Sequence, residues 1–240
     1  MRNHRLYSDQ TLEAGAEVTL GEKPTHYLTR VLRLAAGAEF VLFNGDGSDY
    51  RCRLTAFDRG TAKVEVLERR PNAAQSPLEI TLSQALSRGE RMDYCLQKVT
   101  ELGVAAVQLL HTERVELKLS GERLKKRMAH WRGIMQSASE QCGRATVPEL
   151  RAPIVLLEWI AVPGRRLVLD AGAERSLPQL ERADAVDIAV GPEGGFSEAE
   201  LAAMKGKGVV AVRLGPRILR TETAGPAAIA ILQSLAGDLR

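Results

Sequence analysis

The sequence has few of the residues that build covalent or metal frameworks. Its 240 residues include only three cysteines and four histidines. Cys52, Cys95 and Cys142 lie far apart, are odd in number and form no C-x-x-C pair, and the histidines show no metal-ligand spacing. We therefore expect neither a disulfide framework nor a metal site. The cysteines are interpreted as small buried apolar residues.

The chain also lacks long apolar runs and a large excess of charge of one sign. No apolar stretch approaches the roughly 20 residues that span a bilayer, and the N-terminal residues MRNHRLYSD contain no apolar signal core. We therefore expect a cytoplasmic protein with no membrane partner. The 33 basic and 30 acidic residues leave a net charge of only +3, so local clusters of charge are more informative than the total.

Two glycine-containing segments stand at strand-to-helix junctions in the C-terminal half. GPEGGFSEAE occupies 191–200 and LGPRILRTETA occupies 214–224, each at the end of a short apolar run of strand character. In a parallel α/β sheet such junctions lie at the carboxyl ends of the strands, where ligands bind and glycines let the backbone approach them. Ser197 and Glu200 have the spacing of a capping box, so a helix is expected to begin near Ser197.

A plain turn is the alternative interpretation of GPEGG, because glycine and proline occur in loops of every kind. The second segment favours a ligand site. Arg217, Arg220 and Glu222 crowd into residues that are otherwise apolar or small, and charges at a strand end need a partner or a ligand.

Together the two segments resemble the signature pair of the RsmE family, the SPOUT-class methyltransferases that methylate N3 of a uridine in small-subunit (16S) ribosomal RNA. The resemblance extends from a basic N-terminal helix to Ala224. It implies an N-terminal PUA-like β-barrel domain and a C-terminal SPOUT α/β domain with a deep trefoil knot, a rare exception to the rule against knotted chains. The knot would run from Asp170 through the last helix. The resemblance also implies a homodimer with the substrate site at the subunit interface.

The N-terminal residues are predicted to form a small β-rich domain. Strand candidates lie at 17–20, 39–43, 50–56 and 62–67, with the turn signal NGDG between the second and third. The stretch 70–77 contains two prolines and no apolar periodicity, which is typical of a linker. The chain is therefore divided into an RNA-binding domain at 1–72 and a methyltransferase domain at 73–240.

Residues 24–34 are predicted to form one short helix with Tyr27, Val31 and Leu34 toward the core. The opposite face is basic, and such a face is usually only solvated. Beside the arginines near the start of the chain it is a candidate phosphate-binding surface, and HYLTRVLR at 26–33 resembles the family's N-terminal motif. The candidate RNA-binding residues here are Arg2, Arg5, His26, Arg30 and Arg33.

From Leu78 onward strand and helix patterns alternate, which predicts an α/β sheet with mostly parallel strands. Strands are expected at 78–82, 104–110, 166–170 and near 186 and 209, with helices at 91–102, 122–142, from about 197, and up to about 239. Pro226 excludes an uninterrupted helix from Arg220, so the last helix is expected to begin at Thr223 or Ala224. Gly225-Pro226 departs from the alanine-rich run expected of the family.

Two further arginines lie in segments similar to family motifs. Arg88 stands in the loop before the helix at 91–102, and Arg144 follows Gly143, the expected C-cap of the helix at 122–142. Both are candidate RNA contacts, and helix capping is the alternative for Arg144.

The resemblance implies that S-adenosylmethionine binds between the two signature loops. The implied cofactor-binding residues are Leu169, Gly191, Pro192, Glu193, Gly194, Gly195, Leu214, Gly215, Ile218, Leu219 and Thr221, and the implied catalytic residues are Arg220, Arg217, Glu222 and Glu193. A uracil N3–H is a weak acid, so an arginine would stabilise the anion while Glu193 or Glu222 takes the proton or orients the sulfonium. The alternative is an internal salt-bridge network that only holds the loops.

Two other functions stay open. A related SPOUT enzyme would methylate a ribose hydroxyl or a transfer RNA base, because cofactor loops do not identify the acceptor atom. A non-catalytic RNA-binding ribosome assembly factor would lack affinity for the cofactor. The intact segments 191–195 and 217–223 argue against this second alternative.

Overall fold

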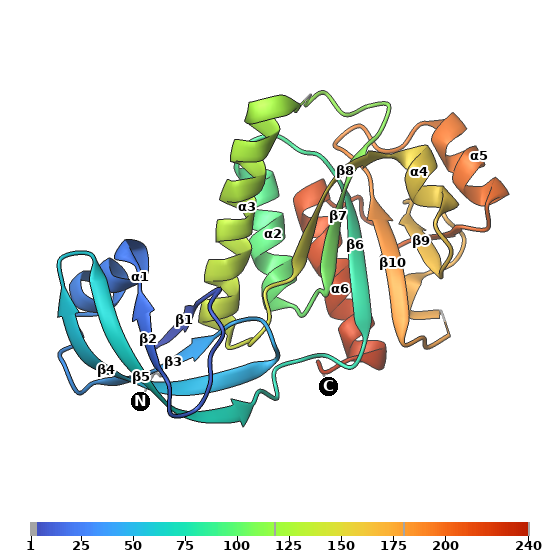
Figure 1. Ribbon diagram of the computed structural model, residues 1–240. Helices are drawn as coiled ribbons and strands as arrows, with labels where there is room; N and C mark the ends of the chain where they lie inside the picture. The colour runs from blue at the N-terminus through green and yellow to red at the C-terminus, as the bar shows by residue number, and fades with distance from the viewer. Residues whose placement is uncertain (1–3, 118, 180, 240) are drawn as a thin grey trace. The chain divides into compact units, whose positions relative to one another are not determined.

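The computed structural model describes residues 4–117, 119–179 and 181–239, which divide into two compact units. The first contains the residues up to Gln75 together with Ser139–Val147, and the second contains Ser76–Ala138 and the residues from Pro148 onward. Figure 1 shows that the first is built mainly on strands and that the second is a sheet covered by helices. The last turn of a long helix thus belongs to the first unit although it lies far along the chain.

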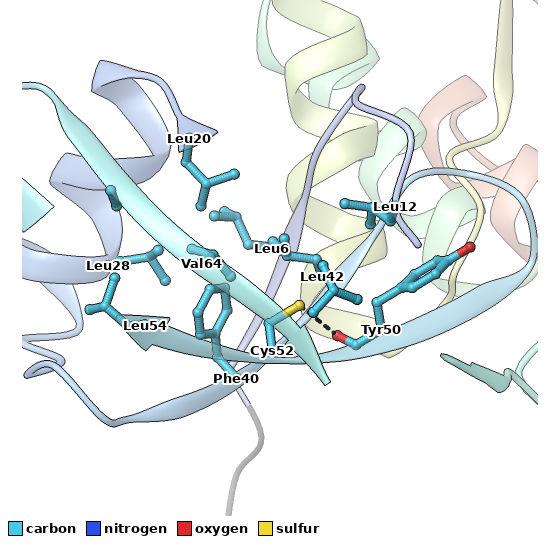
Figure 2. Close-up of a cluster of buried hydrophobic side chains, with 12 residues drawn as sticks. Leu6, Leu12, Leu20, Leu28, Phe40, Leu42, Tyr50, Cys52, Leu54 and Val64 are labelled. Atoms are coloured by element: carbon cyan, nitrogen blue, oxygen red, sulfur yellow. Dashed lines mark hydrogen bonds between the residues drawn. The ribbon is translucent and has the colours of Figure 1, made fainter. Parts of the chain in front are cut away.

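The first unit is a five-stranded sheet in the order β1-β3-β4-β5-β2. Its four antiparallel-paired strands are β2 (Glu17–Leu20), β3 (Glu39–Phe43), β4 (Ser48–Asp58) and β5 (Thr61–Pro71), which confirms the four predicted strands. β1 (Arg5–Tyr7) pairs in parallel with β3 and was not predicted, because three residues are too few to show an alternating pattern. Leucines, Phe40, Tyr50 and Cys52 form its core (Figure 2).

The predicted helix at 24–34 differs from the observed one in its bounds and in its phase. The observed helical segment ends at Val31, so Arg33 and Leu34 lie beyond it. An α-helix, α1 (Glu22–His26), continues as a π-helical turn, η1 (Tyr27–Val31), in which the Leu32 N–H donates to the Tyr27 carbonyl at 2.9 Å. This i to i+5 bond adds a residue to the turn and rotates the following side chains. Leu28, three residues after the buried Thr25, enters the core, and Leu32 and Leu34 pack against it. The prediction that Tyr27 and Val31 face the core was wrong, since they are 37% and 57% exposed.

The second unit is a six-stranded sheet in the order β11-β9-β10-β6-β7-β8, and every pairing among the described residues is parallel, as predicted. The strands are β6 (Glu79–Ala85), β7 (Ala106–His111), β8 (Glu149–Val155), β9 (Arg166–Leu169), β10 (Ala185–Val190) and β11 (Val210–Val212). β8 was not predicted. It lies at the edge of the sheet and contains Pro153, a residue that edge strands tolerate but that weakens the strand signal in the sequence.

The helices of this unit are α2 (Glu90–Glu101), α3 (Gly121–Cys142), α4 (Leu156–Ala161), α5 (Glu198–Gly206) and α6 (Thr221–Ala236), with a 3-10 turn at Leu177–Gln179. Four of these helices were predicted. α4 was not, because its six residues are too few to display a helical period. No helix in the described part of the chain is both long and apolar enough to cross a bilayer.

The last helix begins earlier than predicted. α6 starts at Thr221 rather than at Thr223 or Ala224, so Pro226 is its sixth residue and lies beyond the first turn. Proline has no N–H for the Glu222 carbonyl, so the helix loses that bond. Packing against the sheet offsets the loss: a Cβ on Gly225 would lie 3.2 Å from the Leu82 side chain and 3.3 Å from Gln84. The tertiary contact therefore overrides the local effect of the proline.

The two faces of the parallel sheet carry different cores. Gly225 of α6 contacts Leu82 and Cys95, which places α2 and α6 on one face. The next residue of β6, Ser83, points to the other face and donates to Asp187 Oδ1 at 2.6 Å, while Trp159 Nε1 of α4 donates to Oδ2 at 2.8 Å. Burial raises the pKa of Asp187, and these two hydrogen bonds oppose the shift.

The cysteines provide a test of this packing. Cys52 and Cys95 are buried, which confirms their interpretation as core residues, whereas Cys142 is only half-buried. Burial raises the pKa of both the Cys52 and the Cys95 thiol to about 12.

Because the thiolate is the reactive form, we expect iodoacetamide at neutral pH to modify Cys142 and to spare Cys52 and Cys95 in the folded protein. Peptide mass spectrometry measures this, and a denatured sample, in which all three react, is the control. Rapid modification of Cys52 or Cys95 in the folded protein would contradict the burial of these two side chains.

Candidate functional site

A cavity of about 710 Å³ lies at the carboxyl ends of three neighbouring strands of the second unit. Leu169, Val190 and Val212, the last residues of β9, β10 and β11, form its floor, and the segments that follow these strands form its walls. Its volume is within the roughly 300–1,000 Å³ of small-molecule sites. The position, outside the carboxyl ends of parallel strands, is where ligands bind in open α/β sheets.

The structure brings the predicted cofactor residues together at this cavity. Every one of them lines it: Leu169, Gly191, Pro192, Glu193, Gly194, Gly195, Leu214, Gly215, Ile218, Leu219 and Thr221. The four candidate catalytic residues, Arg217, Arg220, Glu222 and Glu193, line it as well. Asp170 and Ala171, which follow β9, also contribute to the wall, as expected for a third strand-end loop.

Two glycines shape the cavity through the absence of a side chain. A Cβ on Gly191 would lie 3.2 Å from the Phe196 ring and 3.3 Å from the backbone carbon of Gly195, closer than an ordinary contact. Gly215 has a φ of +139°, a conformation that L-residues rarely adopt. Both signature loops therefore depend on glycine for their course along the cavity wall.

The Thr221 hydroxyl joins three separate parts of the chain. It donates to the Gly191 carbonyl at 2.8 Å and accepts from Gln84 Nε2 at 2.9 Å. Thr221 is 6% exposed. The hydroxyl thus ties the first residue of α6 to the first signature loop and to the end of β6, and it is used for structure rather than left facing the cavity.

The first signature loop is held at its far end by a capping box and by a distant segment. Ser197 Oγ accepts from the Glu200 N–H at 3.2 Å and the Glu200 carboxylate accepts from the Ser197 N–H at 2.8 Å, which confirms the predicted helix start. The other Glu200 oxygen accepts from the Glu113 N–H at 2.8 Å, and Arg114 Nη1 donates to the Gly194 carbonyl at 2.7 Å. Two residues of the segment after β7, Glu113 and Arg114, therefore hold the first signature loop in place through these hydrogen bonds.

The charged residues at the cavity differ in how they are paired. Arg91 of α2 forms an ion pair with Glu193 at 2.7 Å. Within the described residues, no ion pair or hydrogen bond engages the side chains of Arg217, Arg220 or Glu222, so the alternative of an internal salt-bridge network among them is not observed. The pKa of the Cys95 thiol is raised by burial and secondarily by the Glu222 carboxylate. Sequence reasoning missed Arg91 and Arg114, because no local pattern links them to a loop about a hundred residues away.

The basic face of the N-terminal unit is exposed. His26, Arg30 and Arg33 are all exposed, and none of their side chains takes part in an ion pair within the part of the chain that the structure describes. The changed helix phase adds Tyr27 to the same exposed surface. Sequence reasoning had assigned this residue to the core. RNA-binding proteins stack bases on exposed aromatic rings. Arg2 lies outside the described residues.

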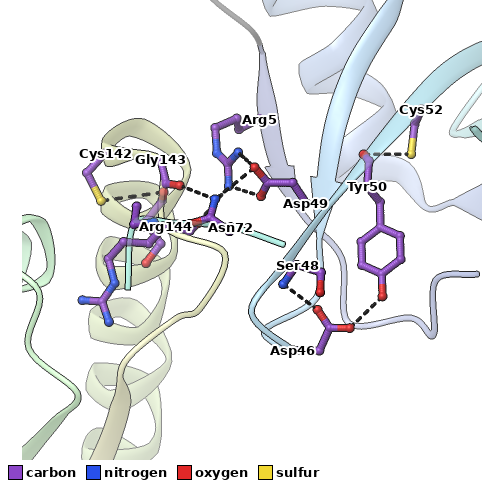
Figure 3. A network of polar contacts seen from close by, with 12 residues as sticks. Arg5, Asp46, Ser48, Asp49, Tyr50, Cys52, Asn72, Cys142, Gly143 and Arg144 are labelled. Atoms are coloured by element: carbon purple, nitrogen blue, oxygen red, sulfur yellow. Dashed lines mark hydrogen bonds and ion pairs between the residues drawn. The ribbon is translucent and has the colours of Figure 1, made fainter. Parts of the chain in front are cut away.

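Arg5 and Arg144 lie in a partly buried network of polar contacts, whose members are drawn in Figure 3. Two hydrogen bonds of 2.7 Å join the Arg5 guanidinium to Asp49, and a third, of 3.0 Å, joins it to the Arg144 carbonyl. Asn72 donates to Asp49 and to the Gly143 carbonyl, both at 2.9 Å. Arg144 itself is 4% exposed. These contacts attach the segment after α3 to the first unit.

Arg88, the remaining candidate RNA contact, is a surface residue of the second unit. It forms an ion pair of 3.2 Å with Glu116, and the two side chains are 65% and 76% exposed. Such a pair contributes at most about 1 kcal/mol and exchanges readily with another anion.

Comparisons with known protein families, related sequences and solved structures all indicate similarity to RNA methyltransferases. An RNA methyltransferase domain matches residues 74–233, and an RNA methyltransferase PUA domain matches residues 20–67. Ribosomal RNA small subunit methyltransferase E of Buchnera aphidicola is 32% identical over 98% of this chain and 97% of its own length. The crystal structure of the Neisseria gonorrhoeae enzyme of that name, bound to S-adenosylmethionine, is 38% identical with a TM-score of 0.94 over 100% of both chains. A Legionella pneumophila structure with the same bound cofactor is 35% identical, with a TM-score of 0.95 over 100% of both chains.

Replacing Thr221 tests the junction between the loops. Thr221→Val keeps the volume but leaves the buried Gln84 amide and the Gly191 carbonyl without this partner, so we expect the free energy of unfolding to fall by about 1–3 kcal/mol. Thr221→Ser, the matched control, keeps the hydroxyl and retains most of the stability. Urea denaturation measures both. Equal stability of the valine and serine variants would show that the hydroxyl does not hold the two loops together.

Proposed function

The chain belongs to the ribosomal RNA small subunit methyltransferase E family, and from this premise we propose that it transfers a methyl group from S-adenosylmethionine to N3 of a specific uridine in small-subunit ribosomal RNA. The observation that carries the proposal is the single cavity lined by both signature loops, with two arginines beside it that have no protein partner among the described residues. A small-molecule site next to unpaired cations suits a reaction in which an anion of the substrate must be stabilised.

The residues of the cavity fit the proposed cofactor. The glycine-dependent loops at 191–195 and 214–219 offer backbone groups without side chains in the way, and Leu169, Leu214 and Leu219 offer apolar surface for an adenine ring. When bound, S-adenosylmethionine supplies an electrophilic methyl group. The protein's part is to hold the acceptor nitrogen beside that group and to manage one proton.

Arg217 and Arg220 would stabilise the uracil anion that forms when N3 loses its proton. Their charge is available because no carboxylate of the described residues neutralises either side chain. Of the two candidate carboxylates, Glu222 is the better proton acceptor, since Arg91 already engages Glu193 at 2.7 Å. The deprotonated N3, held beside the cavity by these side chains, would accept the methyl group that bound S-adenosylmethionine supplies, and the methylated base would be neutral.

RNA binding is assigned to the N-terminal unit and to the surface arginines. We propose that residues 1–72 form the RNA-binding domain and 73–240 the methyltransferase domain. His26, Arg30 and Arg33 would contact phosphates while Tyr27 stacks on a base. Arg88 would exchange Glu116 for a phosphate. Arg5 and Arg144, held in internal contacts, would support this surface by fixing the segment after α3, and Arg2 remains a candidate phosphate contact.

The remaining features of the family are proposals for this chain. They are a PUA-like barrel in the first unit, a SPOUT trefoil knot between Asp170 and the end of α6, a cytoplasmic location, and a homodimer that completes the substrate site. Sedimentation of the purified protein tests the dimer directly.

The reaction itself is tested with small ribosomal subunits that lack the modification. We expect the purified protein and S-adenosylmethionine to produce N3-methyluridine, identified by mass spectrometry of nucleosides. Arg220→Ala and Glu222→Gln are each expected to lower kcat by roughly a hundredfold, the usual effect of removing one stabilising group. Lys205→Ala removes an exposed cation of α5 outside the cavity and is expected to leave kcat unchanged.

Other outcomes would identify the alternatives. A ribose-methylated nucleoside, or methylation of transfer RNA in place of ribosomal RNA, would mean a different target for the same fold. Binding to ribosomal RNA with no calorimetric binding of S-adenosylmethionine would overturn the enzyme assignment and leave an assembly factor.

A further inference from the structure

Among the residues that the structure describes, Ile218 has the most exposed large apolar side chain. It is 88% exposed, whereas Leu157, the next highest, is 67% exposed. Exposing a side chain of this size forgoes the favourable burial of its apolar surface. The neighbouring Leu214 and Leu219 are both partly buried, so the segment separates its apolar residues into two that turn inward and one that projects outward.

The segment that carries Ile218 is fixed at both ends. Pro216 restricts the backbone before it, because the proline ring fixes φ. After it, the Thr223 and Ala224 N–H groups both donate to the Arg220 carbonyl, at 2.9 and 2.8 Å. The outward position of Ile218 is therefore a property of an anchored loop at the start of α6.

Ile218 also lies where the proposed reaction takes place. It lines the 710 Å³ cavity together with Arg217 and Arg220. Both arginines are exposed, and their side chains have no ion pair or hydrogen bond among the described residues. The other exposed large aliphatic residues described in this unit are Val155, Leu157, Val162 and Leu239, and none of them lines the cavity. In the sequence Ile218 is flanked by these two available cations, and an RNA strand offers a base stack flanked by phosphates.

We propose that Ile218 is a positioning residue that enters the base stack of the RNA beside the target uridine and holds that nucleotide out of the stack, in the cavity. The proposal rests on the proposed function and deepens it. N3 lies on the pairing edge of uracil, so the base must leave its stack before it can be methylated. Inserted isoleucine and leucine side chains fill the space that a displaced base leaves, and adjacent arginines hold the backbone.

The experiment compares Ile218→Ala with Ile218→Leu, which keeps an aliphatic wedge. Single-turnover methyl transfer to unmethylated small ribosomal subunits is measured at saturating enzyme. We expect Ile218→Ala to lower the transfer rate by roughly tenfold to a hundredfold. Calorimetry should show a much smaller effect on the affinity for S-adenosylmethionine, because the Ile218 side chain is 88% exposed and the contribution proposed for this loop to the cofactor site comes from its backbone groups. Ile218→Leu should recover most of the rate. Leu157→Ala removes an exposed aliphatic side chain away from the cavity and should have no effect.

A second readout does not depend on methyl transfer. An RNA duplex with a single uridine next to 2-aminopurine is titrated with each variant, and unstacking raises the fluorescence of that analogue. Wild type and Ile218→Leu should raise it, and Ile218→Ala should not. A rise in fluorescence without methylation of the subunits would support the insertion of Ile218 into the base stack and would contradict the proposed function.

Three results would overturn the proposal. The first is an Ile218→Ala variant with the wild-type transfer rate and the wild-type fluorescence response. The second is a loss of rate that parallels a loss of cofactor affinity, which would make Ile218 part of the cofactor site. The third is dissociation of a dimer by Ile218→Ala in sedimentation, which would make Ile218 a contact between two copies of the chain.

Discussion

The hydroxyl of Thr221 is the contact on which the site depends. It bonds to the Gly191 carbonyl and to the Gln84 amide, and so joins the start of α6, the loop after β10 and the end of β6 at one buried point. Without these hydrogen bonds, nothing would join the first signature loop to the residue where the second one ends. With it they form two walls of one cavity, because the last helix is held against the sheet at the residue where the second loop ends.

The same end of the chain shows how packing compensates for an unfavourable local sequence. Pro226 removes a hydrogen bond from α6, yet the helix extends through it because Gly225 fits against Leu82, Gln84 and Cys95. On the opposite face of the sheet, Ser83 and Trp159 both donate to the buried Asp187 carboxylate. Neighbouring residues of β6 thus connect the sheet to helices on both sides, and the carboxyl ends of its strands are left to hold the cavity.

The sequence predicted the fold best where the signals were local and repeated. Four strands of the first unit, the mostly parallel pairing of the second, and the helix start at Ser197 all follow from alternation, apolar periodicity and the S-x-x-E capping pattern. It failed where those signals were weak. β1 and α4 are short, β8 is an edge strand containing proline, and the π-turn at Tyr27 inserts a residue that no helical pattern anticipates.

The sequence by itself determined the chemical content of the cavity. The glycines, the two arginines and the acidic residues are contiguous in two segments, so their identity and their position at strand ends could be read from local order. Only the tertiary structure decided which residues of these two segments form ion pairs or hydrogen bonds with distant parts of the chain. Arg91 pairs with Glu193, Arg114 holds the Gly194 carbonyl, and Glu113 meets Glu200, in each case across about 80 to 100 residues of chain. Contacts at that separation are set by how the strands and helices pack together, because nothing in the local sequence specifies them.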